Sequence, residues 1–313
     1  MSEPAMTSVG GLRLRLPATS ANLGPGFDAV AVALNFYLEL ESAPAAEFSI
    51  AATGRNADRC GRIDGNLVLE TYKGILVAKD RPIVPLAIKM LNEIPLAMGC
   101  GSSAAGRLAA ISLAVHFGQL GWSSQRILYE AYQLEGHPDN VAACWLGGFV
   151  AAACDGEVVR AAQVTPPAEW RAIVVLPGES LATSKARAVL PATYPVKDVV
   201  ANIQSVAMLG LAFAQGRGDL LRIAMSDRIH QPYRAAMCPL LPLMLPLVGE
   251  EGILGAALSG AGPAVLVIVE TEECVEKASE TIRKALGNPD AAELLVCSLE
   301  GFGVTKSAVS SLD

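Results

Sequence analysis

Two glycines and two serines form a short cluster, Gly99-Cys-Gly-Ser-Ser103, directly before an alanine-rich apolar segment. That segment, Ala104 to Phe117, places Leu, Ile and Val among alanines and precedes Gly118, which predicts a helix. Glycine lets the backbone approach an anion closely, and the free N–H groups and dipole at a helix N-terminus favour negative charge. The cluster therefore predicts a phosphate-binding loop, and a tight turn with a helix cap is the structural alternative.

The glycine pattern separates this loop from two common phosphate-binding loops. No lysine follows the second glycine, Gly101, as the lysine-bearing loop of the large NTPase class requires. Gly99 to Ala104 does fit G-x-G-x-x-A, which leaves a dinucleotide-binding oxidoreductase as an alternative. That fold needs a strand that ends in an acidic residue about 20 residues further on. The nearest acid, Glu130, lies inside a predicted helix, so this alternative is the weaker one.

A second polar cluster follows the first predicted strand, in the segment Pro17 to Asp28. Asn22 offers both a hydrogen-bond donor and an acceptor, and Asp28 offers an anion that can hold an ammonium group. The small residues around them can lay these groups against a ligand. An ordinary turn with an Asx cap is the alternative interpretation.

A third cluster, Glu135-Gly-His-Pro-Asp-Asn140, joins two predicted helices. The carboxylate of Glu135 offers oxygen ligands of the kind that magnesium binds together with phosphate oxygens. His137, Asp139 and Asn140 can face a substrate. In the structural alternative, Asp139 is a helix cap and His137 a turn residue.

The composition narrows the class of protein. The 313 residues carry a formal net charge of −7 and no basic run, which argues against nucleic acid as a partner. No uncharged apolar run reaches the ~18 residues that a membrane span requires. Seven cysteines without a C-x-x-C pair predict reduced thiols in a cytoplasmic protein, and three histidines give little support to a zinc site.

The pattern of elements predicts two α+β units. Strand-like pieces begin the chain, and helices at 66–78 and 123–135 follow them. A proline-rich polar stretch then precedes a new apolar strand, so we place the domain boundary there, between residues 1–168 and 169–313. The elements expected in the second unit are helices at 199–215 and 218–229, strands at 255–258 and 264–269, a helix at 272–286 and a strand at 292–298.

Six segments, in order along the chain, carry the motifs of one protein family. Pro95 to Ala105 fits the phosphate-loop pattern P-x-x-x-G-L-G-S-S-A-A, except that Cys100 takes the place of leucine. The other patterns are P-A-x-S-A-N-L-G-x-G-F-D at 17–28, E-G-H-P-D-N-V-A at 135–142, T-x-x-A-R-x-x-L-P at 183–191, D-x-x-H-x-P-Y-R at 227–234 and G-A-x-L-S-G-A-G-P at 255–263. On these motifs the chain resembles the GHMP family of small-molecule kinases, and most closely the members that act on L-homoserine.

The resemblance implies a fold and a reaction. An N-terminal domain like domain 2 of ribosomal protein S5 would cover residues 1–168, and a ferredoxin-like C-terminal domain would cover 169–313, with the active site between them. The implied activity is that of an ATP-dependent phosphotransferase, which transfers the γ-phosphoryl group to the side-chain hydroxyl of L-homoserine in threonine biosynthesis. ATP and magnesium are the implied cofactors. A cytoplasmic homodimer that binds neither membrane nor nucleic acid is also implied.

The resemblance also assigns residues to the nucleotide and the metal. Asn66 matches a position near the adenine pocket, while Ser102 and Glu135 match positions that hold magnesium. The positions that wrap the phosphates of ATP are Pro95, Leu96, Ala97, Met98, Gly99, Cys100, Gly101, Ser102, Ser103, Ala104 and Ala105.

The substrate side carries the charges that a small zwitterion needs. By resemblance, Asp28 would pair with the ammonium group, and Arg187 and Arg234 would bind the carboxylate with forked hydrogen bonds. Without the surrounding motifs, the two arginines would be assigned to surface or interdomain ion pairs.

Further polar residues fall around the reacting end of the substrate. These residues are Asn22, His137, Asn140 and Thr183. The resemblance gives no general base, because positioning and charge neutralisation supply most of the rate of phosphoryl transfer. The catalytic positions are then Asn140, Ser102 and Glu135.

Two alternatives of the same fold stay open. The chain departs from the family patterns at Cys100 and at the small residues Ala31, Ala143 and Ala182. A GHMP kinase that acts on another small alcohol, such as an isoprenoid intermediate, is the nearest alternative. A non-catalytic ligand sensor is the second, and the intact metal and transfer positions argue against it.

Overall fold

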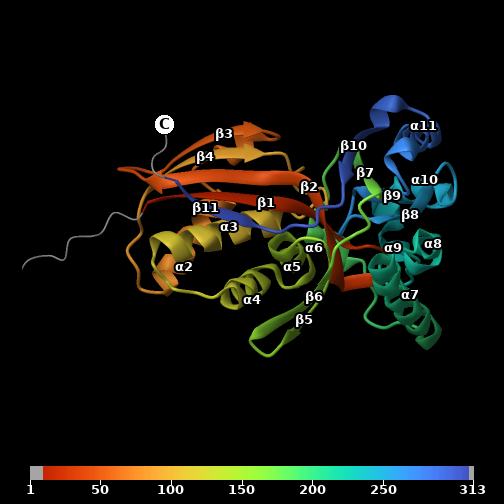
Figure 1. Cartoon of the computed structure of the whole chain (residues 1–313), viewed down its shortest axis with the longest axis horizontal. Coiled ribbons are helices and arrows are strands. Elements are labelled where there is room, and N and C mark those ends of the chain that lie inside the picture. Colours follow the sequence, from red (N-terminus) through yellow and green to blue (C-terminus); the bar gives the residue numbers. More distant parts are fainter. Residues whose placement is uncertain (1–9, 310–313) are drawn as a thin grey trace, which may run out of the picture.

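A seven-stranded sheet carries the first unit of the computed structural model, which describes residues 10–309 (Figure 1). Its strand order is β11–β1–β2–β4–β3, and β5 and β6 extend from β2 as a hairpin. The strands are β1 (Gly11–Asn22), β2 (Gly26–Pro44), β3 (Ser49–Gly54), β4 (Leu86–Asn92), β5 (Phe149–Asp155), β6 (Val158–Val164) and β11 (Thr305–Val309). Only β3 and β4 pair in parallel among these described strands. A dinucleotide-binding fold needs a mostly parallel sheet, so that alternative is wrong.

The longer helices of the first unit cover one face of this sheet (Figure 1). They are α2 (Leu67–Ala78), α3 (Ser102–Phe117), α4 (Ser124–Glu135) and α5 (Asp139–Leu146), and a single-turn helix, α1 (Ala57–Cys60), follows β3. The central helix, α3, packs against β1, α2, α4 and α5. Its alanines, such as Ala105 and Ala110, are fully buried, because a helix enclosed on all sides needs small apolar side chains around its circumference. The predicted helix after the glycine cluster is therefore confirmed.

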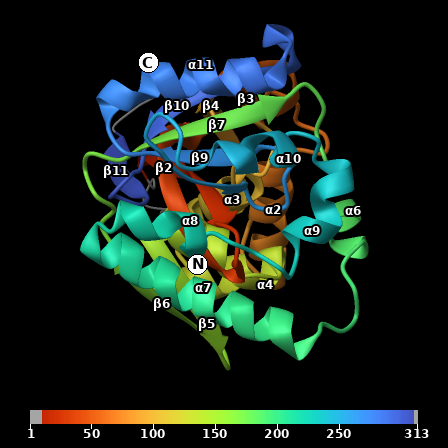
Figure 2. The ribbon, with the colours of Figure 1, turned by 90° about the vertical axis from the view of Figure 1, so that its right-hand side faces the viewer.

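A four-stranded antiparallel sheet carries the second unit, in the order β10–β7–β9–β8. The strands are β7 (Arg171–Pro177), β8 (Ile253–Leu258), β9 (Val265–Val269) and β10 (Ala292–Ser298). The α-helices are α6 (Thr183–Ala188), α7 (Val196–Gln215), α8 (Leu221–Ala224), α9 (Gln231–Arg234), α10 (Leu241–Met244) and α11 (Val275–Leu286). Short 3-10 turns lie at Gly218–Leu220, Ala235–Met237, Leu245–Leu247, Glu272–Cys274 and Pro289–Ala291. Figure 2 shows α11 along one side of this sheet and α7 on the opposite side of the unit.

The two faces of β9 pack into two different apolar cores, one of which extends into the first unit. Leu266 and Ile268 enter the large core that continues into the first unit. Val265 and Val267, on the opposite face, pack into a second core with residues of α10 and α11. Successive side chains of a strand point to opposite faces, so one strand can serve both cores.

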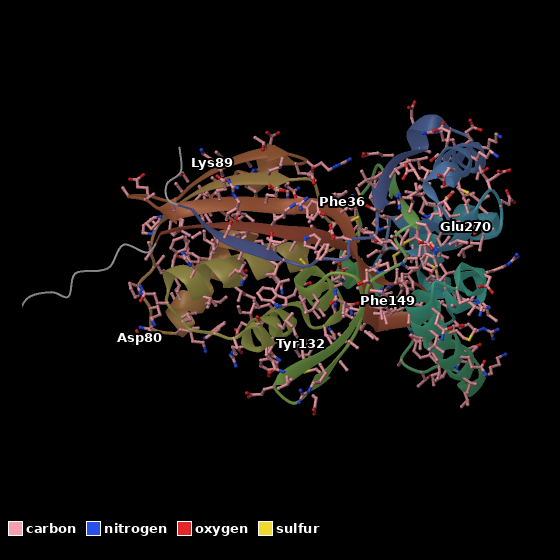
Figure 3. The ribbon with its side chains drawn as sticks, viewed as in Figure 1. Phe36, Asp80, Lys89, Tyr132, Phe149 and Glu270 are labelled. Atoms are coloured by element: carbon pink, nitrogen blue, oxygen red, sulfur yellow. The ribbon has the colours of Figure 1, made fainter. Side chains whose placement is uncertain are left out.

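An aromatic cluster closes the junction between the units. Phe213 of α7 stacks on Phe149 of β5, with ring centroids 4.4 Å apart, and meets the edge of Trp170 at 5.3 Å. Figure 3 shows Phe149 where the first unit meets the second. The side chain of Phe213 is buried. The two sheets are therefore held by continuous apolar packing, which fixes the cleft between them.

The end of the described chain returns to the first unit. β11 pairs with β1 in antiparallel register, from Gly11 opposite Val309 to Arg15 opposite Thr305. The strand satisfies backbone groups that the edge of β1 would otherwise leave unpaired. β7 begins at Arg171, close to the boundary predicted from the sequence, but residues 305–309 pair with the first sheet rather than the second. We therefore propose that the first unit includes this C-terminal strand.

One predicted helix, 218–229, is wrong beyond residue 224, where α8 ends. The carboxylate of Asp227 accepts hydrogen bonds from the backbone N–H groups of Ile229, His230 and Gln231. Local side-chain acceptors of this kind compete with the helical hydrogen-bond ladder. The chain turns there and begins α9 instead.

α7 alone among the described helices is long and apolar enough to cross a membrane by length and composition. Part of its surface is buried in the protein, and Asn202 on that side donates to the carbonyl of Pro25 at 2.7 Å. Val196 and Ile203 lie on its exposed side.

We expect Phe213→Ala to lower the free energy of unfolding by about 3–5 kcal/mol, because it removes a buried ring and leaves a cavity at the junction. Leu211→Ala is the matched control, since Leu211 lies on the same helix and is 54% exposed. Urea unfolding followed by fluorescence measures both. Equal small losses for the two variants would contradict the role given to the aromatic cluster.

Candidate active site

The predicted phosphate loop connects β4 to α3 and is clamped from two sides. The backbone N–H of Thr19 in β1 donates to the carbonyl of Cys100 at 3.1 Å, and the hydroxyl of Ser259 donates to the carbonyl of Gly99 at 2.8 Å. Gly99 and Gly101 both have positive φ, +83° and +71°. A Cβ atom on Gly99 would collide with the carbonyl oxygen of Ser259, and one on Gly101 with the hydroxyl of Thr19. Glycine is required at both positions because the neighbouring chains approach so closely.

A cavity of about 270 Å³ opens beside this loop, between the two units. Its polar side chains from the first unit are Asn22, Asp28, Ser102, Ser103, Arg107, Glu135, His137, Asp139 and Asn140. The second unit contributes Thr183, Arg187 and Arg234. The three polar clusters of the sequence therefore converge on one cavity, although they are far apart along the chain.

The loop presents part of its backbone to the cavity and part of it to the core. Ala97, Gly99, Gly101 and Ala104 line the cavity, together with the two serines. Cys100 is buried, and burial raises the pKa of its thiol to about 12. The residue that replaces leucine in the pattern therefore packs inward as a small apolar group.

Glu135, the predicted metal ligand, lies at the end of α4 and faces the start of α3. Its Oε1 atom accepts a hydrogen bond from the hydroxyl of Ser103 at 2.6 Å. The Nε atom of Arg107 lies 3.0 Å from the same oxygen. Ser102 lines the same cavity, but the serine that donates a hydrogen bond to Glu135 in this structure is Ser103.

Asp28 and Arg187 form a two-point ion pair across the cavity. The two guanidinium nitrogens of Arg187 donate to the two carboxylate oxygens of Asp28, each at 2.9 Å. Sequence reasoning gave these residues to opposite ends of a zwitterion, and the structure pairs them with each other. An ammonium group and a carboxylate are the two charges that could replace this contact.

Arg234 is buried at the base of the cavity. Its Nε atom donates to the carbonyl of Ala186 at 3.0 Å, and its Nη1 atom lies 3.1 Å from Nδ1 of His230. The other ring nitrogen of His230 lies 2.7 Å from the carbonyl of Gly24, so it carries the proton and leaves Nδ1 as the acceptor. Burial lowers the pKa of His230, which keeps the ring neutral beside the guanidinium. Both Arg234 and Arg187 lie 5.2 Å from the centroid of the Phe27 ring.

His137 and Asp139 form a coupled pair at the start of α5. Nδ1 of His137 lies 2.5 Å from the carboxylate of Asp139, which also accepts the backbone N–H of Asn140 at 2.7 Å. Burial alone would lower the pKa of His137, but the hydrogen bond and charge of Asp139 outweigh it and raise that pKa. The amide oxygen of Asn140 accepts the hydroxyl of Thr19 at 2.6 Å. The cluster is therefore fixed by contacts with β1 and α5.

Among the charged side chains of the wall, sequence reasoning left the role of Asp139 open and gave no role to Arg107. By sequence, Asp139 could be a cap or a substrate contact, and the structure places its buried carboxylate in the cavity wall beside His137. Arg107 gives a usable signal, because it is the one arginine or lysine in the apolar segment 104–117. A charged side chain within a helix otherwise buried among apolar residues marks a position that could face a site.

Two predicted binding residues have their side chains engaged in holding the fold. Asn66 caps α2, accepting from the N–H groups of Val68 and Leu69 and donating to the carbonyl of Cys60. Asn22 lines the cavity, but its amide oxygen accepts from the N–H of Asp28 and its amide nitrogen donates to the carbonyl of Gly260. The amide of Asn22 fixes backbone in the cavity wall, whereas Asn66, predicted near the adenine pocket, is not among the residues that line this cavity.

Family models match a segment in each of the two units. The GHMP kinases N terminal domain matches residues 66–148, and the GHMP kinases C terminal domain matches residues 211–288. A homoserine kinase of Solibacter usitatus is 43% identical over 94% of this chain and 97% of its own length.

Solved structures share the fold over nearly the whole chain. The crystal structure of homoserine kinase from Cytophaga hutchinsonii has a TM-score of 0.79 at 23% identity, covering 98% of this chain and 100% of that one. MDDEF in complex with MVAPP, AMPPCP and magnesium has a TM-score of 0.66 at 15% identity, covering 96% and 99%. The α+β fold expected from the motifs is confirmed. The chain belongs to the GHMP kinase family.

Proposed function

We propose that this protein transfers the γ-phosphoryl group of ATP to the side-chain hydroxyl of L-homoserine, and releases O-phospho-L-homoserine, ADP and the hydroxyl proton. The observation that carries the proposal is the convergence of a glycine-lined phosphate loop and a zwitterion-matched charge set on one cavity. The homoserine kinase of Solibacter usitatus, which aligns over nearly the full length of both chains, supports the same reaction.

The nucleotide end of the cavity is built from backbone N–H groups and hard oxygen donors. The first turn of α3 directs free N–H groups toward phosphate oxygens, and the helix dipole favours their negative charge. Ser102 and Glu135 would hold magnesium, since a hydroxyl and a carboxylate are ligands that this ion takes beside phosphate oxygens. The ion, when bound, neutralises charge on the phosphates.

At the amino-acid end, the charged groups of the substrate would replace the contact between Asp28 and Arg187. Its ammonium group would form an ion pair with the carboxylate of Asp28. Its carboxylate would accept hydrogen bonds from the guanidinium groups of Arg187 and Arg234. Each charge of the zwitterion then replaces a charge of the same sign, so the cavity gains a ligand without an unpaired ion. Thr183, at the start of α6, completes this wall.

The acceptor hydroxyl would lie between these two ends, beside Asp139, His137 and Asn140. The hydrogen bonds from Thr19 to Asn140 and from Asn140 to Asp139 hold this wall in one geometry. Fixed polar groups of this kind orient the hydroxyl toward the γ-phosphorus, and positioning of that kind supplies much of the rate in phosphoryl transfer. Asp139 thus joins the residues predicted from the sequence.

The proposal also includes the setting of the reaction. We place the protein in the cytoplasm, as a homodimer that acts in threonine biosynthesis without a membrane or nucleic-acid partner. The family resemblance supports the oligomer and the pathway. The net charge of −7 argues against nucleic acid, the scattered cysteines support a reducing compartment, and the absence of a long uncharged apolar run argues against a membrane anchor.

In a coupled ATP-consumption assay, we expect kcat/KM for L-homoserine to exceed that for mevalonate by at least about 100-fold, because mevalonate has no ammonium group for Asp28. Equal or reversed preference would favour the alternative of a GHMP kinase for another alcohol. No turnover of either compound, with ligand binding intact, would favour the sensor.

Arg187→Ala should raise the KM for homoserine by about 10- to 100-fold, the range expected when a charged hydrogen-bonding partner is lost. The KM for ATP should not change, because the phosphate loop lies at the other end of the cavity. Steady-state kinetics with each substrate varied in turn measures both. Arg217→Ala is the control, as Arg217 pairs with Asp219 at an exposed site. An equal rise in both KM values would contradict the division of the cavity.

Glu135→Gln keeps an acceptor for Ser103 but removes the negative charge. We expect the apparent affinity for magnesium, measured from the metal dependence of turnover, to fall by at least about 10-fold. Glu130→Gln, on the same helix but paired with Arg126, is the matched control. Normal magnesium dependence in the Glu135 variant would show that the metal is held elsewhere.

A further inference from the structure

Arg107 is a charged residue inside a helix that is otherwise apolar and buried. It lies one turn after Ser103 on α3, between the buried residues Gly106 and Leu108, and its side chain is 24% exposed. The side chain reaches the cavity wall beside Ser103 and Glu135. A guanidinium at such a position gives up part of its hydration, so its contacts have to replace that loss.

The contacts of Arg107 satisfy only part of its guanidinium. Nε lies 3.0 Å from Oε1 of Glu135. The Nη1 atom is shielded from solvent and has no hydrogen-bond partner within residues 10–309. A buried donor of a charged group without a partner is unfavourable, and such donors are rare in folded proteins. Arg107 as a residue lines the cavity, so a shift of its guanidinium when a ligand binds would bring this donor to an acceptor there.

The other cationic groups of the cavity wall are engaged at the amino-acid end. Arg187 forms two hydrogen bonds with Asp28, and Arg234 is held by Ala186 and His230. The phosphate loop, residues 95–105, contains no lysine or arginine. Arg107 is thus the cation that the described wall places next to the loop, where a triphosphate brings several negative charges.

We propose that Arg107 is a further nucleotide-contacting residue, whose guanidinium shifts on binding to donate a hydrogen bond to a terminal phosphate oxygen of ATP while Nε holds Glu135 in place. The assignment rests on the proposed function, because it requires ATP in this cavity. Arginine suits both contacts, since its planar fork presents several donors in fixed directions. Lysine, with a single ammonium group, cannot hold both acceptors in the same geometry.

The contact predicts a difference between nucleotides that carry and lack the terminal phosphate. The test is calorimetric titration of the full chain with AMPPCP and with ADP, both with magnesium in excess. Arg107→Gln should bind AMPPCP about 10-fold more weakly than the original protein, as expected for loss of a hydrogen bond to a charged group. Its affinity for ADP should fall much less, because ADP lacks the terminal phosphate and loses only the support that Arg107 gives to Glu135. Arg107→Lys should recover only part of the loss.

A control variant and the ADP titration distinguish a direct phosphate contact from an indirect effect on the loop. Arg126→Ala removes another arginine–glutamate pair, outside the cavity, and should leave both affinities unchanged. Equal weakening of AMPPCP and ADP in Arg107→Gln would mean that Arg107 acts only by supporting the loop, and unchanged AMPPCP binding would mean that it does not touch the nucleotide. Either result overturns the assignment. Failure of the unaltered protein to bind AMPPCP would instead overturn the proposed function, and this assignment with it.

Discussion

The turn after β8, residues 259–263, is the constraint on which the active site depends. Ser259 donates to the carbonyl of Gly99 in the phosphate loop, and the N–H of Gly260 donates to the carbonyl of Ala21 in β1 at 3.0 Å. These contacts require that no side chain stand at position 99, which explains the glycine there. One turn of the second unit thus fixes both the loop and the first polar cluster of the first unit. The shared apolar core behind them keeps the two sheets from separating.

The charges of the cavity are arranged as one ion pair at each end. Glu135 contacts Arg107 at the nucleotide end, and Asp28 contacts Arg187 at the amino-acid end. The Asp28–Arg187 pair lies partly exposed, where an ion pair contributes little net stability, so opening it for a zwitterion costs little. The Glu135–Arg107 pair is more deeply buried and stays closed, which holds Glu135 in place. The cavity can remain neutral when empty and still present strong contacts to a nucleotide and a zwitterion.

Patterns within short segments of the sequence predicted those features that depend on neighbouring residues alone. The helix after the glycine cluster follows from its apolar periodicity, and the three polar clusters from their residue types. Contacts between distant segments were beyond such patterns. The amide of Asn22 is committed to Gly260, 238 residues away. The helix expected at 218–229 ends early because Asp227 captures the backbone N–H groups that follow it. The contact between Arg107 and Glu135 also could not be predicted, because the two residues lie on different helices.

The most direct measurement of the central claim is a crystal structure of the protein with AMPPCP, magnesium and L-homoserine. The account predicts that the two hydrogen bonds between Asp28 and Arg187 are replaced, with the ammonium group on Asp28 and the substrate carboxylate on Arg187 and Arg234. The triphosphate should lie along residues 99–104. An intact Asp28–Arg187 pair, with homoserine or the triphosphate bound elsewhere, would contradict the account.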